Sequence, residues 1–244
     1  PILSTILAFL FGSLAGLLTA ILFTKLRIKP LLSGILTMTI LYSVNLRING
    51  KSNIPLFKYD SIYNLGSRMV ILLIIVFFIK IVLDMFLKTE AGYLIIATGD
   101  NEALVKSLGK NNDRYKIIGL MISNGLVALS GALMAQFQGF ADITMGSSII
   151  VIALASIIIG DTIKRNSSFF KGTTRAILGA LIYRLIGGIA IDLGLNPNDL
   201  KAINALIVIV FITYNNFSGN LLDLFKLKEV ETVAKNKKTI ENFQ

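Results

Sequence analysis

A nineteen-residue apolar stretch occupies residues 69–87 and reads MVILLIIVFFIKIVLDMFL. Its only charged side chains are Lys80 and Asp84, which stand four residues apart. A helix that crosses the apolar core of a bilayer needs roughly 20 mostly apolar residues. The stretch therefore predicts a transmembrane helix, and the spacing of the two charges favours a local ion pair on one face of that helix.

Comparable apolar runs recur along the chain. Of its 244 residues, 54% are hydrophobic and 16% are charged, and the mean hydropathy is +0.74. These values exclude a soluble domain and predict an all-α, polytopic helical membrane protein. We expect about seven transmembrane helices, at residues 1–24, 31–46, 69–87, 116–136, 147–163, 176–194 and 202–217.

Missing residue types and motifs remove most enzyme classes. The sequence contains no Cys and no His, which excludes disulfides, thiolate or histidine metal sites, cysteine nucleophiles and Ser-His catalysis. It also contains no Gly-x-x-x-x-Gly-Lys-Ser/Thr loop that could hold nucleotide phosphates. We therefore expect no catalytic residue, no metal and no cofactor in this sequence.

The distribution of Lys and Arg predicts the topology. If residues 25–29 are cytoplasmic, the alternation of spans also places 88–116, 164–175 and the basic tail 218–244 on that side. This side then holds 17 Lys and Arg, against five on the opposite side. Cytoplasmic segments of membrane proteins carry such an excess, and anionic lipid accounts for the basic tail without nucleic acid.

Polar residues in and beside two spans are candidates for a translocation pathway. The segment 31–46 is short and polar, which indicates a broken or pathway-lining helix, because polar groups at membrane depth are costly unless they face protein or water. Hydrogen bonds between helices, or from Thr to its own helix backbone, are the competing explanation. The candidates are Thr37, Thr39, Tyr42, Asn45, Gln136 and Gln138.

One polar stretch on the predicted cytoplasmic side contains a short amphipathic helix. Asp100 or Asn101 can cap a helix over 101–108, and Gly109 stands where a left-handed residue would end it. Ala103, Leu104 and Leu108 give this helix an apolar side. With no core of its own to join, it is expected to lie on the membrane or to insert into a partner.

Three stretches carry a family resemblance. Residues 97–109, ATGDNEALVKSLG, followed by Asp113-Arg114, resemble the coupling-helix loop of permeases in the branched-chain amino-acid and ribose class of ABC importers. Residues 33–39, SGILTMT, with 45–50, NLRING, and residues 135–146, AQFQGFADITMG, resemble the tryptophan-type subgroup of this class.

The resemblance implies a transmembrane permease domain over 1–217, with a cytoplasmic coupling loop at 88–116, in a multi-pass protein of the bacterial inner (plasma) membrane. It further implies a second permease copy, ATPase subunits that bind the ATP, an extracytoplasmic solute-binding protein and a small solute, with an amino acid as the first expectation. The residues it assigns to ATPase coupling are Gly99, Asp100, Asn101, Glu102, Leu104, Leu108 and Gly109.

Three further expectations concern the chain as a whole. It begins at Pro1 without Met or a basic leader, which indicates a fragment that lacks N-terminal spans. Leu14–Ala20 can be aligned with Leu129–Ala135 as an inverted repeat, although small residues that allow close helix packing explain the match equally well. The alternative function is a secondary transporter driven by an ion gradient, which would use intramembrane charges such as Asp84 and Asp192.

Overall fold

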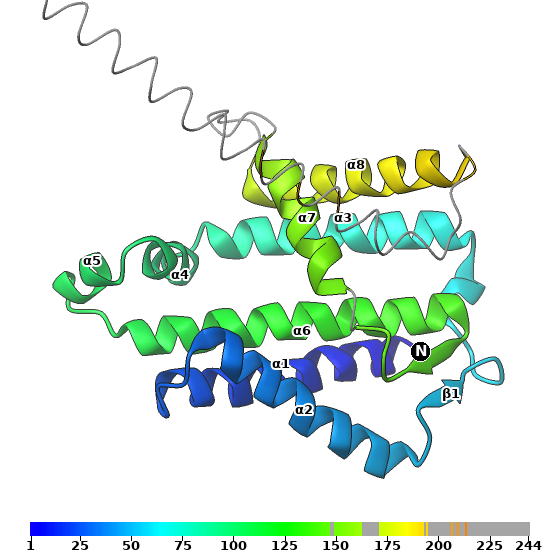
Figure 1. Cartoon of the computed structure of the whole chain (residues 1–244), viewed down its shortest axis with the longest axis horizontal. Coiled ribbons are helices and arrows are strands. Elements are labelled where there is room, and N and C mark those ends of the chain that lie inside the picture. Colours follow the sequence, from blue (N-terminus) through cyan, green and yellow to red (C-terminus); the bar gives the residue numbers. More distant parts are fainter. Residues whose placement is uncertain are drawn as a thin grey trace, which may run out of the picture. The chain divides into compact units, whose positions relative to one another are not determined.

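The computed structural model describes residues 1–146, 149–162 and 171–192, and the single positions 194, 206, 209 and 213. The chain divides into two units, Pro1–Gly146 and Ser147–Gln244, which are described separately. Figure 1 shows the helices of the first unit in blue to green and those of the second in light green to yellow.

Four long helices form the frame of the first unit. They are α1 (Ile2–Thr24), α2 (Pro30–Asn49), α3 (Arg68–Leu87) and α6 (Asn112–Gln138). Each is long and apolar enough to cross a membrane, as is α8 in the second unit, which makes five such helices in the described part of the chain. Many of their large apolar side chains are exposed, α3 having no buried residue at all. Such surfaces suit contact with lipid, where the backbone must be hydrogen-bonded within the helix.

Helix α2 is continuous, so the predicted break within 31–46 is wrong. Pro30 stands in its first turn, where the missing N–H costs nothing, and Gly50 ends it in a left-handed conformation with φ 67°. The polar residues that suggested a break donate to carbonyls of the same helix. These hydroxyls belong to Ser33, Thr37, Thr39 and Ser43.

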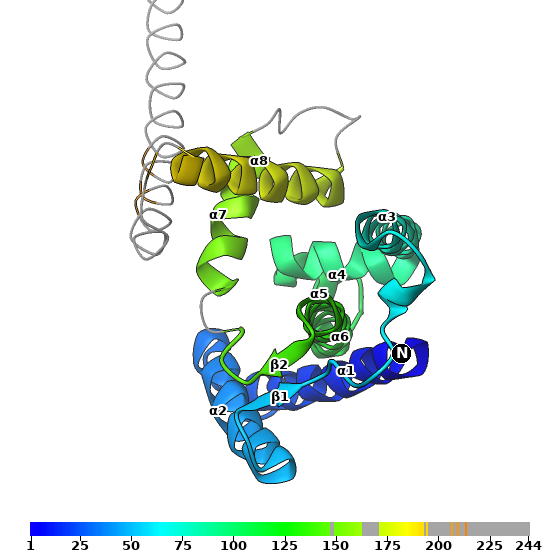
Figure 2. The ribbon, with the colours of Figure 1, turned by 90° about the vertical axis from the view of Figure 1, so that its right-hand side faces the viewer.

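Helices α1 and α6 form the most extensive helix pair of the first unit, and they lie side by side in Figures 1 and 2. They are antiparallel, since Thr5 near the start of α1 bonds to Gln136 near the end of α6. Glycines allow the two helices to approach each other closely. A Cβ on Gly16 would collide with the Leu120 carbonyl and lie 2.8 Å from the Met121 Cα. Close packing thus accounts for Gly16, while the inverted repeat stays a prediction.

The two connections predicted to be external meet at one end of the unit. Strand β1 (Asn53–Pro55) pairs antiparallel with β2 (Phe140–Asp142), with Ile54 opposite Ala141. The 3-10 helix η1 (Ile62–Leu65) lies at the same end and contacts α3 and α6. Its Tyr63 hydroxyl donates to the Leu133 carbonyl at 3.1 Å, and the Tyr63 ring meets Phe137 edge-on. These contacts agree with a topology in which both connections lie on the same side.

Two short helices form the other end of the unit. Helix α4 (Glu90–Asp100) was not predicted, although Thr89 caps it by accepting from the Gly92 N–H. Helix α5 (Glu102–Ser107) follows after a single residue. The predicted helix over 101–108 is confirmed, and the lone residue Asn101 between α4 and α5 has extended backbone angles, which separate the two helices.

The second unit contains α7 (Ile149–Thr162) and α8 (Gly172–Asp192). They pack closely, because Gly160 and Gly179 leave no room for a Cβ against the facing backbone, and Ala155, Ile159 and Tyr183 form a small core. At 14 residues, α7 is shorter than the other spans. The predicted span 202–217, apart from isolated positions, and the tail 218–244 lie outside the described residues.

Candidate functional site

The predicted coupling segment forms an exposed corner built from α4, α5 and the start of α6. Asn101 is the N-cap of α5, since its side-chain oxygen accepts from the N–H groups of Ala103 at 3.0 Å and Leu104 at 3.2 Å. Gly109 follows the helix with φ 71°, a conformation that glycine adopts without a steric cost. Both ends of this six-residue helix are therefore specified by the sequence, as predicted.

All seven residues predicted for ATPase coupling are exposed. Leu104 of α5 and Leu108, the C-cap of α5, are 51% and 60% exposed and stand one turn apart, where positions i and i+4 share a face. Asp100, Asn101 and Glu102 lie next to them in the chain. An exposed apolar pair beside short polar side chains is a surface that can be buried against another protein. We call these seven residues, Gly99, Asp100, Asn101, Glu102, Leu104, Leu108 and Gly109, the coupling surface.

One residue of α5 faces inward and was not predicted from the sequence. Val105 is completely buried, so α5 does have an anchor in its own chain, contrary to the expectation of no core. The apolar pattern of so short a helix does not distinguish the side chain that packs inward from those that remain outside. The only available signal was that Val105 is the one β-branched residue of this helix.

Two polar links hold α5 to α6, and a third ties the connection that follows α5 to α4. The Lys116 Nζ in α6 lies 2.7 Å from the Glu102 Oε1, and the Asn112 side-chain amide donates to the Glu102 carbonyl at 2.8 Å. The Lys110 Nζ lies 2.9 Å from the Glu90 Oε1 in α4. These links tie a short exposed helix to the start of a helix that can cross the membrane.

The charges of these links are mutually stabilised. The hydrogen bond from Lys116 lowers the pKa of the Glu102 carboxyl, and the bond to Glu90 raises the pKa of the Lys110 ammonium. Lys116 also lies 5.0 Å from the centre of the Phe23 ring in α1, within the range of a cation–π contact. Lys116 therefore joins α1, α5 and α6 at one point.

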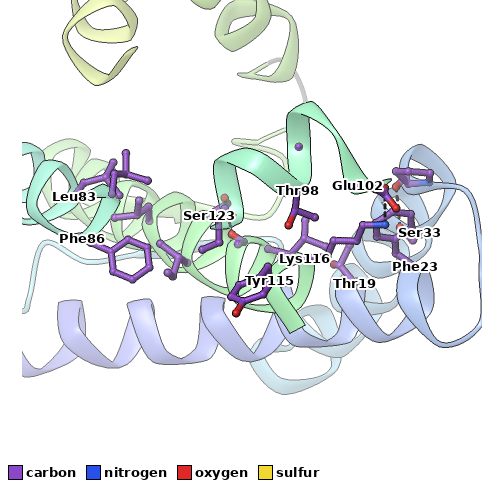
Figure 3. A pocket seen from close by; sticks show the side chains of 18 residues that line it. Thr19, Phe23, Ser33, Leu83, Phe86, Thr98, Glu102, Tyr115, Lys116 and Ser123 are labelled. Atoms are coloured by element: carbon purple, nitrogen blue, oxygen red, sulfur yellow. Dashed lines mark hydrogen bonds and ion pairs between the residues drawn. The ribbon is translucent and has the colours of Figure 1, made fainter. Parts of the chain in front are cut away.

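A cavity of about 580 Å³ opens beside this junction (Figure 3). Its walls come from all four long helices of the first unit and from α4 and α5, and most of the lining is apolar. Glu102 and Lys116 belong to its lining together with hydroxyl-bearing residues. The polar lining consists of Thr19, Ser33, Thr98, Glu102, Tyr115, Lys116 and Ser123. This cavity was not predictable from the sequence, because its residues converge only through the packing of six helices.

The pathway candidates do not converge on one site. The Thr37 hydroxyl is buried and hydrogen-bonds to Thr19 in α1 at 2.9 Å. Gln136 donates to Thr5 of α1 at 2.9 Å and accepts from the Ile62 N–H at 3.1 Å. Thr5 and Thr19 are 14 residues apart on one helix, which corresponds to about 21 Å along its axis.

The remaining pathway candidates differ in their surroundings. Thr39, Tyr42 and Asn45 are exposed on α2, and the Gln138 Oε1 is buried without a partner among the described residues. Gln136 lines a cavity of about 580 Å³ at the opposite end of the unit, together with Ser4 and Tyr59. Their role in a pathway stays a prediction.

The intramembrane charge pair predicted in residues 69–87 is confirmed. The Lys80 Nζ lies 2.9 Å from the Asp84 Oδ2. Both side chains belong to α3, one turn apart, so the pair is local.

Comparison with known proteins identifies the family. The family model described as branched-chain amino acid transport system / permease component matches residues 1–213. A tyrosine transport system permease protein of Clostridioides difficile is 50% identical over 222 residues, which cover 91% of this chain and 75% of the relative. No solved structure matches the chain.

Two further relatives are more distant. An uncharacterized protein of Rickettsia prowazekii is 34% identical over 85% of this chain and 77% of its own length. The ribose import permease protein of Haemophilus influenzae is 26% identical over 86% of this chain and 67% of its own. With five described helices able to cross a membrane, this chain, a multi-pass protein of the inner membrane, belongs to the branched-chain amino acid transport permease family and is a membrane-spanning permease subunit of an ABC importer.

Proposed function

We propose that this permease imports an aromatic amino acid and that its coupling surface docks on a separate ATPase subunit. The solute class is supported by the name of the 50% identical relative, a tyrosine transport permease. The docking role is carried by one observation: the coupling surface is exposed, while the helix that bears it is tied to α6 by the Lys116–Glu102 ion pair.

The links around α5 provide a mechanical route into the membrane. When nucleotide binding draws two ATPase subunits together, a helix docked on one of them moves with it. Because Glu102 and Asn112 connect α5 to the start of α6, that displacement reaches a membrane-crossing helix directly. Lys116 passes it on to Phe23 of α1.

The cavity shown in Figure 3 places a solute-sized space beside this route. Glu102 and Lys116 are part of its wall, so a movement of α5 changes the shape of the cavity. Its apolar and aromatic walls, which include Phe23, Phe86 and Tyr115, suit an aromatic side chain. We propose this cavity as the inner part of the solute path.

A second permease copy and an extracytoplasmic solute-binding protein complete the proposed assembly. An importer of this class receives its solute from the outside, and the paired connections around β1, β2 and η1 form the end of the first unit opposite the coupling surface. This end is the one available to a binding protein.

The test is a copurification of the tagged, intact permease from its native membrane, followed by an uptake and ATPase assay. The variant Leu108→Asp places a charge on the coupling surface at a side chain that is exposed in the permease. It is expected to lose the ATPase subunit while eluting as a folded protein. Ile48→Asp is the matched control, since Ile48 is also exposed, at 75% against 60% for Leu108, and lies on α2 at the opposite end. Retention of a functional ATPase by Leu108→Asp, or its loss by both variants, would contradict the proposed docking.

A further inference from the structure

A second cavity at the coupling end carries an excess of positive charge. It measures about 660 Å³ and lies between the connection from α1 to α2 and the corner formed by α5 and α6. Its charged lining consists of Arg27, Lys29, Lys106, Lys110, Lys116 and the single acid Asp113. The segments that bring these cations together are about 80 residues apart in the sequence, so the cluster is a product of the fold.

Only part of this charge is neutralised within the described residues. Lys110 pairs with Glu90, and Lys116 pairs with Glu102. Arg27, Lys29 and Lys106 are exposed and form no ion pair with any residue that the structure describes. Five cations thus meet three acids, and the remaining cations face one cavity, which favours an anionic ligand.

Arg27 has an unusual backbone conformation for its residue type. Its φ is 53°, and among the described residues it is the only one other than glycine with a positive φ. This conformation is disfavoured when a Cβ is present. The turn is closed by bonds from the Leu26 N–H to the Ile21 carbonyl and from the Ile28 N–H to the Leu22 carbonyl. A disfavoured conformation kept at an arginine that lines a cavity points to a role for its side chain.

The cavity lies where two helices that can cross a membrane end, which is where lipid headgroups are expected. It opens where α1 ends at Thr24 and α2 begins at Pro30, and both helices can cross a membrane. Leu26 and Leu31 flank the basic residues and are 62% and 81% exposed. A ligand that satisfies both kinds of surface has a negative phosphate for the cations and apolar chains for the leucines.

We propose that this cavity binds the phosphate-bearing headgroup of an anionic membrane phospholipid, held by Arg27, Lys29 and Lys106. The guanidinium of Arg27 offers paired donors to the phosphate oxygens, and the two ammonium groups add point charges. Because Lys106 belongs to α5 and Arg27 to the α1–α2 connection, the bound lipid bridges the two segments. This bridge gives the lipid an influence on coupling, a consequence that rests on the proposed function, whereas the binding itself does not.

The test measures lipid retention by the intact permease. The purified protein is titrated with phosphatidylglycerol and with phosphatidylcholine and analysed by native mass spectrometry. The variant Arg27→Gln/Lys29→Gln/Lys106→Gln is expected to bind phosphatidylglycerol about a hundredfold more weakly, with phosphatidylcholine binding unchanged. The matched control is Arg47→Gln/Lys51→Gln/Lys58→Gln, which removes the same charge from the opposite end and is expected to keep the site. Equal elution volumes establish that both variants are folded.

Further arms separate the other sources of the same chemistry. Inorganic phosphate is added at millimolar concentration without lipid; if it binds the cavity as tightly as phosphatidylglycerol does, the ligand is a soluble phosphate and the lipid proposal is overturned. Equal binding of the two lipids, or an unchanged affinity in the triple variant, also overturns it. If the triple variant loses the ATPase subunit but keeps phosphatidylglycerol, the cavity is a protein contact and the lipid proposal is wrong. If the triple variant loses phosphatidylglycerol but keeps the ATPase subunit, the lipid proposal is supported. This result does not depend on the outcome of the Leu108→Asp test.

Discussion

The Nζ of Lys116 lies 2.7 Å from the Oε1 of Glu102, so the first residue of α5 is joined by an ion pair to the first turns of α6. Glu102 is half exposed and Lys116 is largely covered. The pair therefore connects an accessible helix, which carries the coupling surface, to a helix that can cross the membrane. Several properties of the protein depend on this ion pair and on the hydrogen bonds of Gln136 at the opposite end of the unit.

Acidification is expected to loosen α5. The hydrogen bond from Lys116 lowers the pKa of the Glu102 carboxyl below its ordinary value. Because the pKa of Glu102 is lower in the folded protein, its ionised carboxylate stabilises the packing of α5 at pH values above about 4.5, the pKa of the unfolded state. This stabilisation is lost as the pH falls through the lower pKa of the folded state. Since Glu102 is half exposed, the effect is at most about 1 kcal/mol. Hydrogen exchange of the α5 amides between pH 7 and pH 3, corrected for intrinsic rates, measures it.

The variant Glu102→Gln supplies the control for this pH dependence. It is expected to show reduced protection of α5 at pH 7 and no further loss on acidification. Glu90→Gln breaks the more exposed pair with Lys110 and should leave most of the pH dependence in place. An identical pH response in wild type and Glu102→Gln would show that another group is responsible.

Gln136 is expected to stabilise the end of the unit opposite the coupling surface. Its side chain joins Thr5 of α1 to the backbone N–H of Ile62 in η1, and Ile62 is buried. Gln136→Met keeps the size of the side chain but removes its hydrogen bonds to Thr5 and to the Ile62 N–H, which costs about 1–3 kcal/mol. The apparent melting temperature, followed by size-exclusion chromatography, should fall by several degrees.

Gln138→Met is the matched control for Gln136. The Gln138 Oε1 is buried with no hydrogen-bond partner among the described residues, so its replacement by an apolar group should be neutral or stabilising. Equal losses in the two variants would mean that side-chain shape, not hydrogen bonding, matters at this end.

These residues illustrate how far the sequence could lead. The spans at 1–24, 69–87 and 116–136 were predictable because about 20 apolar residues are needed to cross a bilayer and few other structures require them. The caps at Asn101 and Gly109 were predictable because a helix end has local chemical demands. Both features depend only on residues close together in the chain.

Features that depend on distant residues were not predictable. The pairing of Ile54 with Ala141 in three-residue strands follows from the positions of α2 and α6, not from any alternation in the sequence. Gln136 was assigned to a pathway because a polar residue in an apolar span indicates function, whereas its amide joins two segments of its own chain. Val105 and the cavity beside Lys116 likewise arise only when several helices are packed together.

The contact between α1 and α6 is expected to tolerate no side chain at Gly16. A Cβ there would meet the backbone of Leu120 and Met121, which cannot move without displacing α6. Gly16→Ala should therefore destabilise the protein by about 1–3 kcal/mol, despite the better helix propensity of Ala. Gly131→Ala is the control, because a Cβ at Gly131 would meet nothing within 4 Å, and it should be neutral or stabilising by up to about 1 kcal/mol. Thermal stability in detergent compares them, and a stable Gly16→Ala would refute the close packing.

The Lys80–Asp84 pair separates an ATP-driven importer from a carrier driven by an ion gradient. Its side chains lie 2.9 Å apart and are 21% and 10% exposed. Asp84→Leu removes the ion-pair partner of Lys80, and the loss of one partner costs about 3–5 kcal/mol when such a pair is buried. We therefore expect Asp84→Leu to lower the yield of folded protein.

The double variant Lys80→Met/Asp84→Leu removes both charges together and is expected to restore folding, because an apolar pair suits a membrane-crossing helix. In liposomes that contain the complete importer, it should keep ATP-dependent uptake that does not respond to ionophores. A carrier that uses Asp84 for ion binding behaves in the opposite way: the double variant folds but transports nothing, and the wild-type protein follows a proton or sodium gradient without ATP. Because folding and transport are read separately, a structural pair and a coupling carboxylate give different results in the same experiment.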